Sequence, residues 1–362
     1  MNTARAPASS KPALHPQQDI LVFDRPLIRR NRRRAAGKFS DHSFLHDWAA
    51  QEIKSRLYDI NRAFPLALEI GFKSFFGDTP TDKVEKLVSM NIGGDIGRSC
   101  NGLLPPPLGV IPNEIADCKA GRDAAEGSSQ LAGCKDPSTP PAQGPGSVGM
   151  TTQSIFADEE FLPFANESFD LVLGTLNLHT VNDLPGALLQ IRKSLKPDGL
   201  FLASMLGGET LYELRQVMTQ AEMNTRGGIS PRIAPFADKQ QMGALLQRAG
   251  FNLPVVDSDI ITVTYDNIFK LFHDLRYMGE GNAIAARDKT PPGKKLFMEA
   301  ARLYQEQFAG ADGRITASFE IIFLTGWAPH SSQQKPLRPG SAETSLADAL
   351  STREIKTGDH CE

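Results

Sequence analysis

Two ionisable side chains, His179 and Glu209, follow apolar runs that we predict to be successive strands of a parallel sheet. Open α/β sheets bind their ligands beyond the carboxyl ends of the strands, so both side chains are placed where chemistry would occur. An imidazole can act there as an acid, a base or a substrate contact. Each residue also has an ordinary alternative: His179 could hydrogen-bond the Asn182–Asp183 turn, and Glu209 could belong to a helix start at Thr210.

A second pattern lies in residues 64–75, where an apolar run ends at Gly71. This pattern predicts a buried parallel strand that turns sharply where a nucleotide-type cofactor would bind. A full G-x-G-x-x-G turn needs small residues, because a Cβ at its second or third glycine would fill the space of the cofactor and the following helix. Residues 72–75 are Phe-Lys-Ser-Phe instead, and the next glycine is Gly77. The sequence therefore predicts a cofactor fold whose cofactor turn is incomplete.

The 362 residues carry a formal net charge of -3, which gives no global attraction to nucleic acid or to an anionic membrane. The length suits one large core with appendages. A basic partner site must be local, and the candidate is the arginine cluster at Arg29–Arg34. Aromatic residues do not alternate with these arginines as they do in single-strand binders. We therefore interpret the cluster as a solvated helix face or a partner-docking arm in preference to a nucleic-acid site.

The four cysteines show no C-x-x-C spacing, which argues against a zinc site and a disulfide framework and favours a reducing compartment. No His, Asp or Glu spacing identifies a metal site, and no apolar run is long enough to predict a transmembrane segment. Residues 1–18 lack acidic residues, as a mitochondrial transit peptide does, but their three prolines favour an unstructured tail. We expect the bacterial cytoplasm in preference to the mitochondrial matrix.

Hydrophobic periodicity and capping residues predict strands alternating with helices, and therefore an α/β fold with a doubly wound, mostly parallel sheet and N-terminal helices. The predicted helices cover 41–62, 184–195 with Asn182 or Asp183 as cap, 210–223 with a Thr210–Glu213 capping box, and 238–250 with an Asp238–Gln241 capping box. The predicted strands cover 66–70, 87–90, 155–157, 169–173, 200–205, 260–263 and 319–324. A Pro-Asp-Gly turn at 196–199 should use Gly199 for a positive φ.

Composition also divides the chain. Residues 1–40 are expected to form an N-terminal tail with the basic arm, and residues 41–330 the main domain. Periodicity is lost at about 97–150, a stretch rich in Gly, Pro, Ser and Ala, which predicts a disordered insertion. Residues 331–362 are expected to be a disordered polar tail.

Several ordered motifs resemble class I S-adenosylmethionine (SAM) methyltransferases. They are Ala157–Phe164, Ser168–Val172, Leu178–Pro185 and Leu195–Gly199. Further segments are similar to a narrower family, the methyltransferase-like arginine hydroxylases that assist assembly of mitochondrial complex I. These segments are Phe23–Arg25, Met205–Arg215, Gly227–Pro231, Ala249–Phe251, Asp274–Asn282 and Gly326–Trp327. The malonyl-carrier-protein methyltransferase of biotin synthesis is a more distant relative.

The resemblance implies a set of cofactor contacts. Leu68–Gly71, which includes Glu69, would lie against the methionine part of SAM. Asn91 falls where the family has an acid that binds the ribose hydroxyls, and an amide cannot replace both acceptor oxygens. Asp95 could substitute, although its spacing is wrong for that role. Asp158, with the neighbouring Glu159, matches the adenine-reading position, the ordinary alternative for Asp158 being a solvated turn residue.

Three functions remain open on this reading. The first is a SAM-dependent enzyme, with His179 or Glu209 as catalytic candidate, that acts in assembly of complex I and modifies a side chain of a peripheral-arm subunit. The second is a non-catalytic assembly chaperone with an eroded cofactor site, which Phe72, Lys73 and Asn91 favour. The third is an O-methyltransferase for a small molecule or a carrier protein. Nucleic acid is not an expected partner, whereas peripheral contact with a membrane is compatible with all three.

Overall fold

The computed structural model describes residues 21–72, 74–76, 82–91, 151–334, 340–341 and 344–353. The predicted insertion at 97–150 lies outside these residues. The chain divides into two units, Met1–Pro329 and His330–Glu362. The first unit holds the sheet and its helices, and the second contains the short helix α9 (Leu346–Ala349). None of the helices in the described residues is both long and apolar enough to cross a bilayer.

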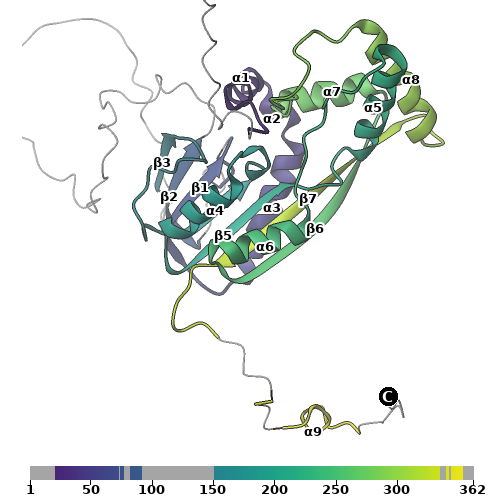
Figure 1. Ribbon diagram of the computed structural model, residues 1–362. Coiled ribbons are helices and arrows are strands. Elements are labelled where there is room, and N and C mark those ends of the chain that lie inside the picture. The colour runs from purple at the N-terminus through teal and green to yellow at the C-terminus, as the bar shows by residue number, and fades with distance from the viewer. Residues whose placement is uncertain are drawn as a thin grey trace, which may run out of the picture. The chain divides into compact units, whose positions relative to one another are not determined.

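The first unit is built on a seven-stranded sheet with the order β3-β2-β1-β4-β5-β7-β6 (Figure 1). Its strands are β1 (Phe64–Gly71), β2 (Val84–Asn91), β3 (Thr151–Phe156), β4 (Phe169–Thr175), β5 (Leu195–Leu206), β6 (Asn252–Tyr265) and β7 (Ile315–Trp327). Strands β1 to β5 pair in parallel, while β7 is antiparallel to both β5 and β6. The carboxyl ends of β1, β2 and β4 therefore meet at one edge of the sheet, which is the ligand edge of this fold class.

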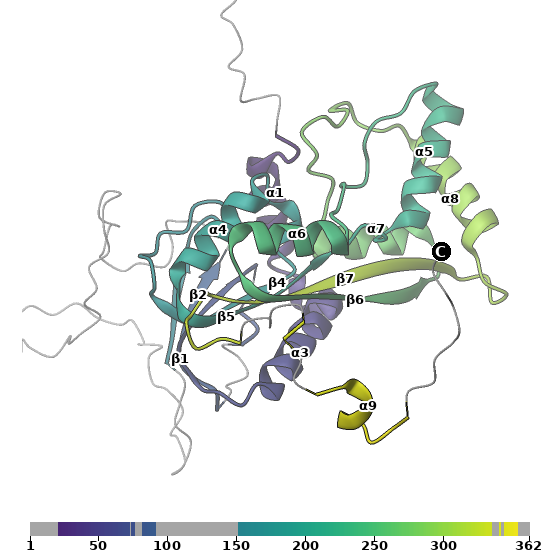
Figure 2. The same cartoon turned by 60° about the horizontal axis from the view of Figure 1, so that its bottom comes forward.

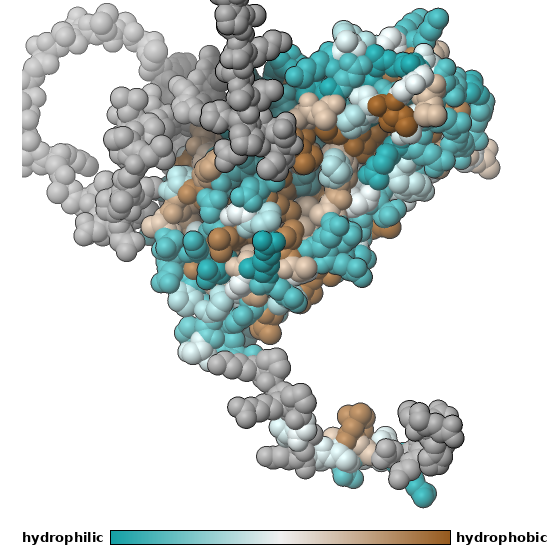
Figure 3. Space-filling view, in the orientation of Figure 1, coloured by the Kyte–Doolittle hydropathy of each residue, from teal (hydrophilic) through white to brown (hydrophobic). Residues whose placement is uncertain are grey.

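Helices cover both faces of the sheet. They are α1 (Arg25–Ala35), α2 (Phe39–His42), α3 (Phe44–Asp59), α4 (Leu184–Ser194), α5 (Tyr212–Arg226), α6 (Lys239–Ala249), α7 (Ile268–Tyr277) and α8 (Lys294–Phe308). Figure 2 shows α3 on one face and α4 and α6 on the other. Alternate residues of β5 join different cores: Leu202 packs in the cluster with α3, and Phe201 in the cluster with α4 and α6. The face of the molecule in Figure 3 carries both hydrophilic and hydrophobic side chains.

Most predicted elements are present, and the doubly wound, mostly parallel sheet is confirmed. Asp183 caps α4 by accepting from the Gly186 N–H, and Asp238 with Gln241 forms the predicted capping box of α6. The predicted helix at 41–62 begins earlier and is interrupted at Ser43, which separates α2 from α3.

Two local predictions are wrong. Thr210 and Glu213 do not form a capping box, because Thr210 Oγ1 donates to the Glu320 carbonyl and Glu213 accepts from Ser318. The left-handed residue of the turn in β5 is Asp198, with φ of 63°, and not Gly199. The arginine cluster lies on α1, where Arg29, Arg30, Arg33 and Arg34 are exposed and Arg32 is 2% exposed.

Candidate functional site

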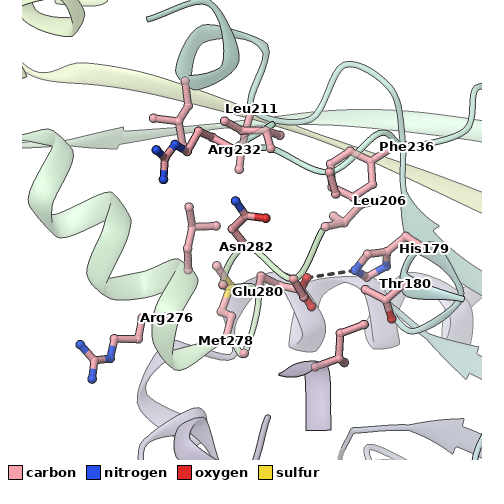
Figure 4. Close-up of a pocket in the computed structure, with 18 of the residues that line it drawn as sticks. His179, Thr180, Leu206, Leu211, Arg232, Phe236, Arg276, Met278, Glu280 and Asn282 are labelled. Atoms are coloured by element: carbon pink, nitrogen blue, oxygen red, sulfur yellow. Dashed lines mark hydrogen bonds and ion pairs between the residues drawn. The ribbon is translucent and has the colours of Figure 1, made fainter. Parts of the chain in front are cut away.

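The described residues enclose a pocket of about 270 Å³ beyond the carboxyl ends of β4 and β5. Its walls come from α1, α3, α5, α7 and the segments that follow β4, β5 and α7. Most of the wall is apolar and includes Leu206, Phe236 and Met278 (Figure 4). The volume is near the lower end of ligand pockets, which begin at about 300 Å³, and suits one long side chain or a small molecule.

Two wall residues adopt a backbone conformation that is unusual for a leucine. Leu176, just after β4, has φ of 44°, and Leu211, just before α5, has φ of 54°. For a residue other than glycine this conformation costs about 1–3 kcal/mol, so the surrounding structure must impose it. Strain of this kind gathers at ligand sites, and both leucines line the pocket.

A histidine and a carboxylate meet in this pocket. His179 lies in a short 3₁₀ helix, Leu178–Thr180, and its Nε2 is 3.2 Å from Oε2 of Glu280. Figure 4 shows the pair facing one another from two separate loops. The His179 side chain is 1% exposed and that of Glu280 is 17% exposed. The prediction that His179 lies at the ligand edge agrees with this position, whereas its hydrogen bond goes to Glu280 and not to the Asn182–Asp183 turn.

The pocket keeps Glu280 ionised and His46 neutral. Burial alone would raise the pKa of Glu280, but the interaction with His179, by attraction and a hydrogen bond, and the charge of Arg32 lower it to about 2. Burial lowers the pKa of His46 to about 4, against the attraction of Glu280. The Nδ1 atoms of His46 and His179 are buried and have no hydrogen-bond partner among the described residues. Such atoms mark a place where a ligand or water is expected.

The residues predicted to bind a cofactor lie together at the ends of β1, β2 and β3, outside this pocket. Gly71 pairs in register with Asn91 and with Thr175, so these three positions are neighbours. The Asn91 amide donates to Ser154 Oγ, at 2.9 Å. The Glu69 carboxylate accepts from the N–H groups of Phe75 and Phe76 and therefore holds the turn that follows β1.

The predicted adenine-reading residues contact α1. Asp158 pairs with Arg25, at 2.5 Å, and with Arg29, and Glu159 is fully buried and accepts from Arg25 at 2.8 Å. Burial would raise the pKa of the Asp158 carboxyl, but the Glu160 N–H and the two arginines lower it. The polar groups that the resemblance assigns to SAM are thus already engaged by the protein.

Other polar atoms at the same edge are open to a ligand. Thr175 Oγ1 and both polar atoms of the Asn177 side chain are buried and have no partner within the described part of the chain. Thr175 is the last residue of β4 and pairs in register with Gly71, and Asn177 follows two positions later. Thr175 and Asn177 fit a polar cofactor bound at the carboxyl ends of β1 and β4. Glu69, Asp158 and Glu159 would have to lose existing contacts to bind one.

Glu209, the second catalytic candidate, is exposed and does not line the pocket. Its backbone N–H donates to Glu320, 3.0 Å away. The structure therefore does not bring Glu209 together with His179.

One cluster with metal-binding side chains was not expected from sequence spacing. His42 at the end of α2 lies beside His273 and Asp274 of α7, with ligand atoms all within 4.8 Å of one another. His42 Nδ1 and Asp274 Oδ1 are 2.8 Å apart, a contact that also joins the two helices. The three residues come from distant parts of the sequence, so no motif could reveal them.

Glu280 and His46 are the pocket residues that sequence reasoning did not assign to a site. The segment Asp274–Asn282 was among the motifs of the resemblance, and that was the one available signal for Glu280. His46 gave no signal, because in sequence it is one residue of an amphipathic helix.

Comparison with known proteins finds a methyltransferase domain in part of the chain. The family described as "Methyltransferase domain" matches residues 137–203. Among solved structures, a putative methyltransferase (BH2331) from Bacillus halodurans is 13% identical, with a TM-score of 0.44, over 77% of this chain and 100% of that one.

Similarity to curated proteins extends much further along the chain. "Arginine-hydroxylase NDUFAF5, mitochondrial" of Danio rerio is 36% identical over 336 residues, which are 92% of this chain and 90% of that protein. The Homo sapiens protein of the same name is 37% identical over 329 residues, 90% of this chain and 83% of that protein. "Malonyl-[acyl-carrier protein] O-methyltransferase" of Xylella fastidiosa is 38% identical over 177 residues, covering 49% of this chain and 58% of that protein.

Proposed function

Because the chain belongs to the family of the arginine hydroxylase NDUFAF5, we propose that it acts in assembly of respiratory complex I by modifying an arginine of a peripheral-arm subunit. The observation that carries the proposal is the extent of the similarity, which reaches 92% of the chain. Relatives that share only the methyltransferase core would match a much smaller part of the chain, as the carrier-protein methyltransferase does with 49%. We place this activity in the bacterial cytoplasm.

The pocket beyond β4 and β5 is the substrate site in this proposal. His179 is its acid or base, held beside the ionised carboxylate of Glu280. The apolar wall excludes water from the reacting side chain. Thr175 and Asn177, at the β1–β4 edge, are the residues that would hold a polar cofactor. SAM bound at that edge would supply a transferable methyl group.

Hydroxylation, the reaction in the relatives' name, has different requirements. Inserting oxygen into a C–H bond of arginine takes one atom of O2, releases the other as water and consumes two electrons from a reductant. The two reactions leave different masses on the arginine, so the product distinguishes them.

The test is deletion of the gene in its own bacterium, with complex I measured on native gels and its subunits analysed by mass spectrometry. We expect less assembled complex I and loss of one oxygen atom or one methyl group from a subunit arginine. His179→Ala should fail to restore the modification, and Glu209→Ala tests the other candidate. Normal complex I in the deletion strain contradicts the proposal.

A non-catalytic assembly chaperone is the second candidate. The engaged carboxylates of Glu69, Asp158 and Glu159 favour it, because a working cofactor site would need some of them. Full restoration of assembly by His179→Ala, with no modified arginine in any strain, would select it. The third candidate is the carrier-protein methyltransferase activity named for the relatives that match about half of this chain. Methyl transfer from SAM to malonyl carrier protein tests it.

A further inference from the structure

Glu280 is the only acidic residue among the side chains that line the described pocket. His179 is its one side-chain hydrogen-bond partner in the described part of the chain, and that contact uses Oε2. The carboxylate remains partly exposed towards the cavity, with 17% of the side-chain surface accessible. A single ionised carboxylate in an apolar pocket is a recognition element for a cation.

Among the ion pairs of the described residues, none joins Glu280 to one of the three arginines that line the same pocket. Arg232 pairs with Glu222, at 2.5 Å, and Figure 4 shows the Arg276 side chain directed away from Glu280. Arg32 donates to Thr180 Oγ1 and lies 3.8 Å from Glu159. Arg32 and Arg232 thus have carboxylate neighbours outside the pocket, whereas the Glu280 carboxylate lines the cavity.

We propose that Glu280 recognises the substrate by accepting hydrogen bonds from the guanidinium of an arginine side chain that enters this pocket. The assignment rests on the proposed function and names its substrate contact. A guanidinium presents five N–H donors in a rigid fork that matches a carboxylate, and it has no acceptor. The pocket offers the complementary set, because it supplies acceptors at Glu280 and at the histidine rings.

The histidines complete this set through their hydrogen-bonding states. In the neutral tautomer of His179 whose Nε2–H donates to Glu280, Nδ1 is an acceptor, and this atom has no partner among the described residues. His46 is neutral at physiological pH, so one of its ring nitrogens is an acceptor as well. Besides its proposed role as acid or base, His179 therefore also positions the carboxylate. The apolar side chains of Leu206, Phe236 and Met278 suit the methylene groups of an arginine.

The test is calorimetry on the purified full chain with four probes: N-acetyl-arginine amide, N-acetyl-citrulline amide, N-acetyl-lysine amide and malonate. Citrulline has nearly the shape of arginine without its charge. We expect arginine to bind at least tenfold more tightly than citrulline, and Glu280→Gln to abolish that preference. Glu280→Asp keeps the charge and should retain the preference with weaker binding. Glu85→Gln, an exposed carboxylate on β2, is the matched control.

The preference for arginine over citrulline is a ratio, so it is independent of the fraction of each variant that folds. An equal affinity for the two probes, an unchanged preference in Glu280→Gln, or tighter binding of malonate would overturn the assignment. Absence of arginine binding up to about 10 mM would do the same. Because these measurements need no complex I, they can fail while the assembly experiment succeeds, and the reverse is equally possible.

Discussion

Buried ionisable side chains give the pocket its chemistry at the scale of single residues. His46 and His179 are 3% and 4% exposed, and His179 and Arg32 both favour the ionised form of Glu280. Because the carboxylate is ionised and His46 is neutral, the folded protein holds a fixed charge pattern that water does not screen strongly. A pH that changes the protonation state of these groups therefore lowers the free energy of unfolding.

We predict that the free energy of unfolding falls by about 3 kcal/mol between pH 6.5 and pH 4, because of His46 alone. Its pKa is about 4 in the folded protein and 6.5 when unfolded, so the unfolded chain takes up the proton first and is stabilised as the pH falls. Urea unfolding at several pH values measures the slope. The contribution should disappear in His46→Gln and persist in His330→Gln, an exposed histidine. An unchanged slope in His46→Gln would contradict the prediction.

At the scale of elements, buried ion pairs and hydrogen bonds fix how helices meet the sheet. Helix α1 is anchored by Arg25, which contacts Asp158, Glu159 and Glu160 after β3. The segment that leads into α5 is fixed to β7, since Thr210, two positions before the helix, exchanges two hydrogen bonds with the backbone of Glu320. Both helices line the pocket, so these contacts also set its shape.

Arg25→Ala should destabilise the protein by about 3–5 kcal/mol, because it leaves the fully buried Glu159 without its closest cation. Arg30→Ala, on the exposed side of the same helix, should change stability by no more than about 0.5 kcal/mol. Thermal and urea unfolding provide the comparison. Equal effects of the two substitutions would show that α1 is not anchored in this way.

Thr210→Asn separates a local cap from a tertiary contact. Asn is as good an N-cap as Thr, so a capping box would tolerate this change. We instead expect a loss of about 1–3 kcal/mol, since Thr210 is fully buried and its hydroxyl both donates and accepts. Asp238→Asn at the true capping box of α6 should be nearly neutral. Unfolding in urea distinguishes the two, and a neutral Thr210→Asn would restore the capping-box interpretation.

At the scale of the molecule, the strand order creates two adjacent sites. The ends of β1, β2 and β4 meet at the edge where the methyltransferase fold places its cofactor, and the pocket lies beyond β4 and β5. Helix α1 belongs to both, because Arg25 and Arg29 contact Asp158 while Arg32 lines the pocket. A ligand that displaced α1 from Asp158 would therefore also move a helix that lines the pocket.

We predict weak SAM binding, with a Kd above about 1 µM, because Asp158 already pairs with two arginines and Asn91 stands where the resemblance leads us to expect a carboxylate. Arg29→Ala should tighten binding by releasing one oxygen of Asp158. Its side chain is 53% exposed, so the fold should be little affected. Calorimetry with SAM measures both. A sub-micromolar Kd for the unmodified chain would mean that α1 does not compete with the cofactor.

The sequence by itself determined the elements that depend on local physics. Apolar runs and capping side chains such as Asp183 and Asp238 predicted the strands and helices, because those signals act within a few residues. Residue order also sufficed for the class I methyltransferase resemblance and for the position of His179 after β4.

Only the tertiary structure decided which side chains face one another. It joined His179 to Glu280, which are 101 positions apart, and Arg25 to Asp158, which are 133 positions apart. It also turned Thr210 and Glu213 from a supposed cap into contacts with β7 and left Glu209 outside the pocket. The physical reason is the same each time: a polar group that burial removes from water takes whichever partner the packed sheet and helices bring to it, and local spacing does not encode that partner.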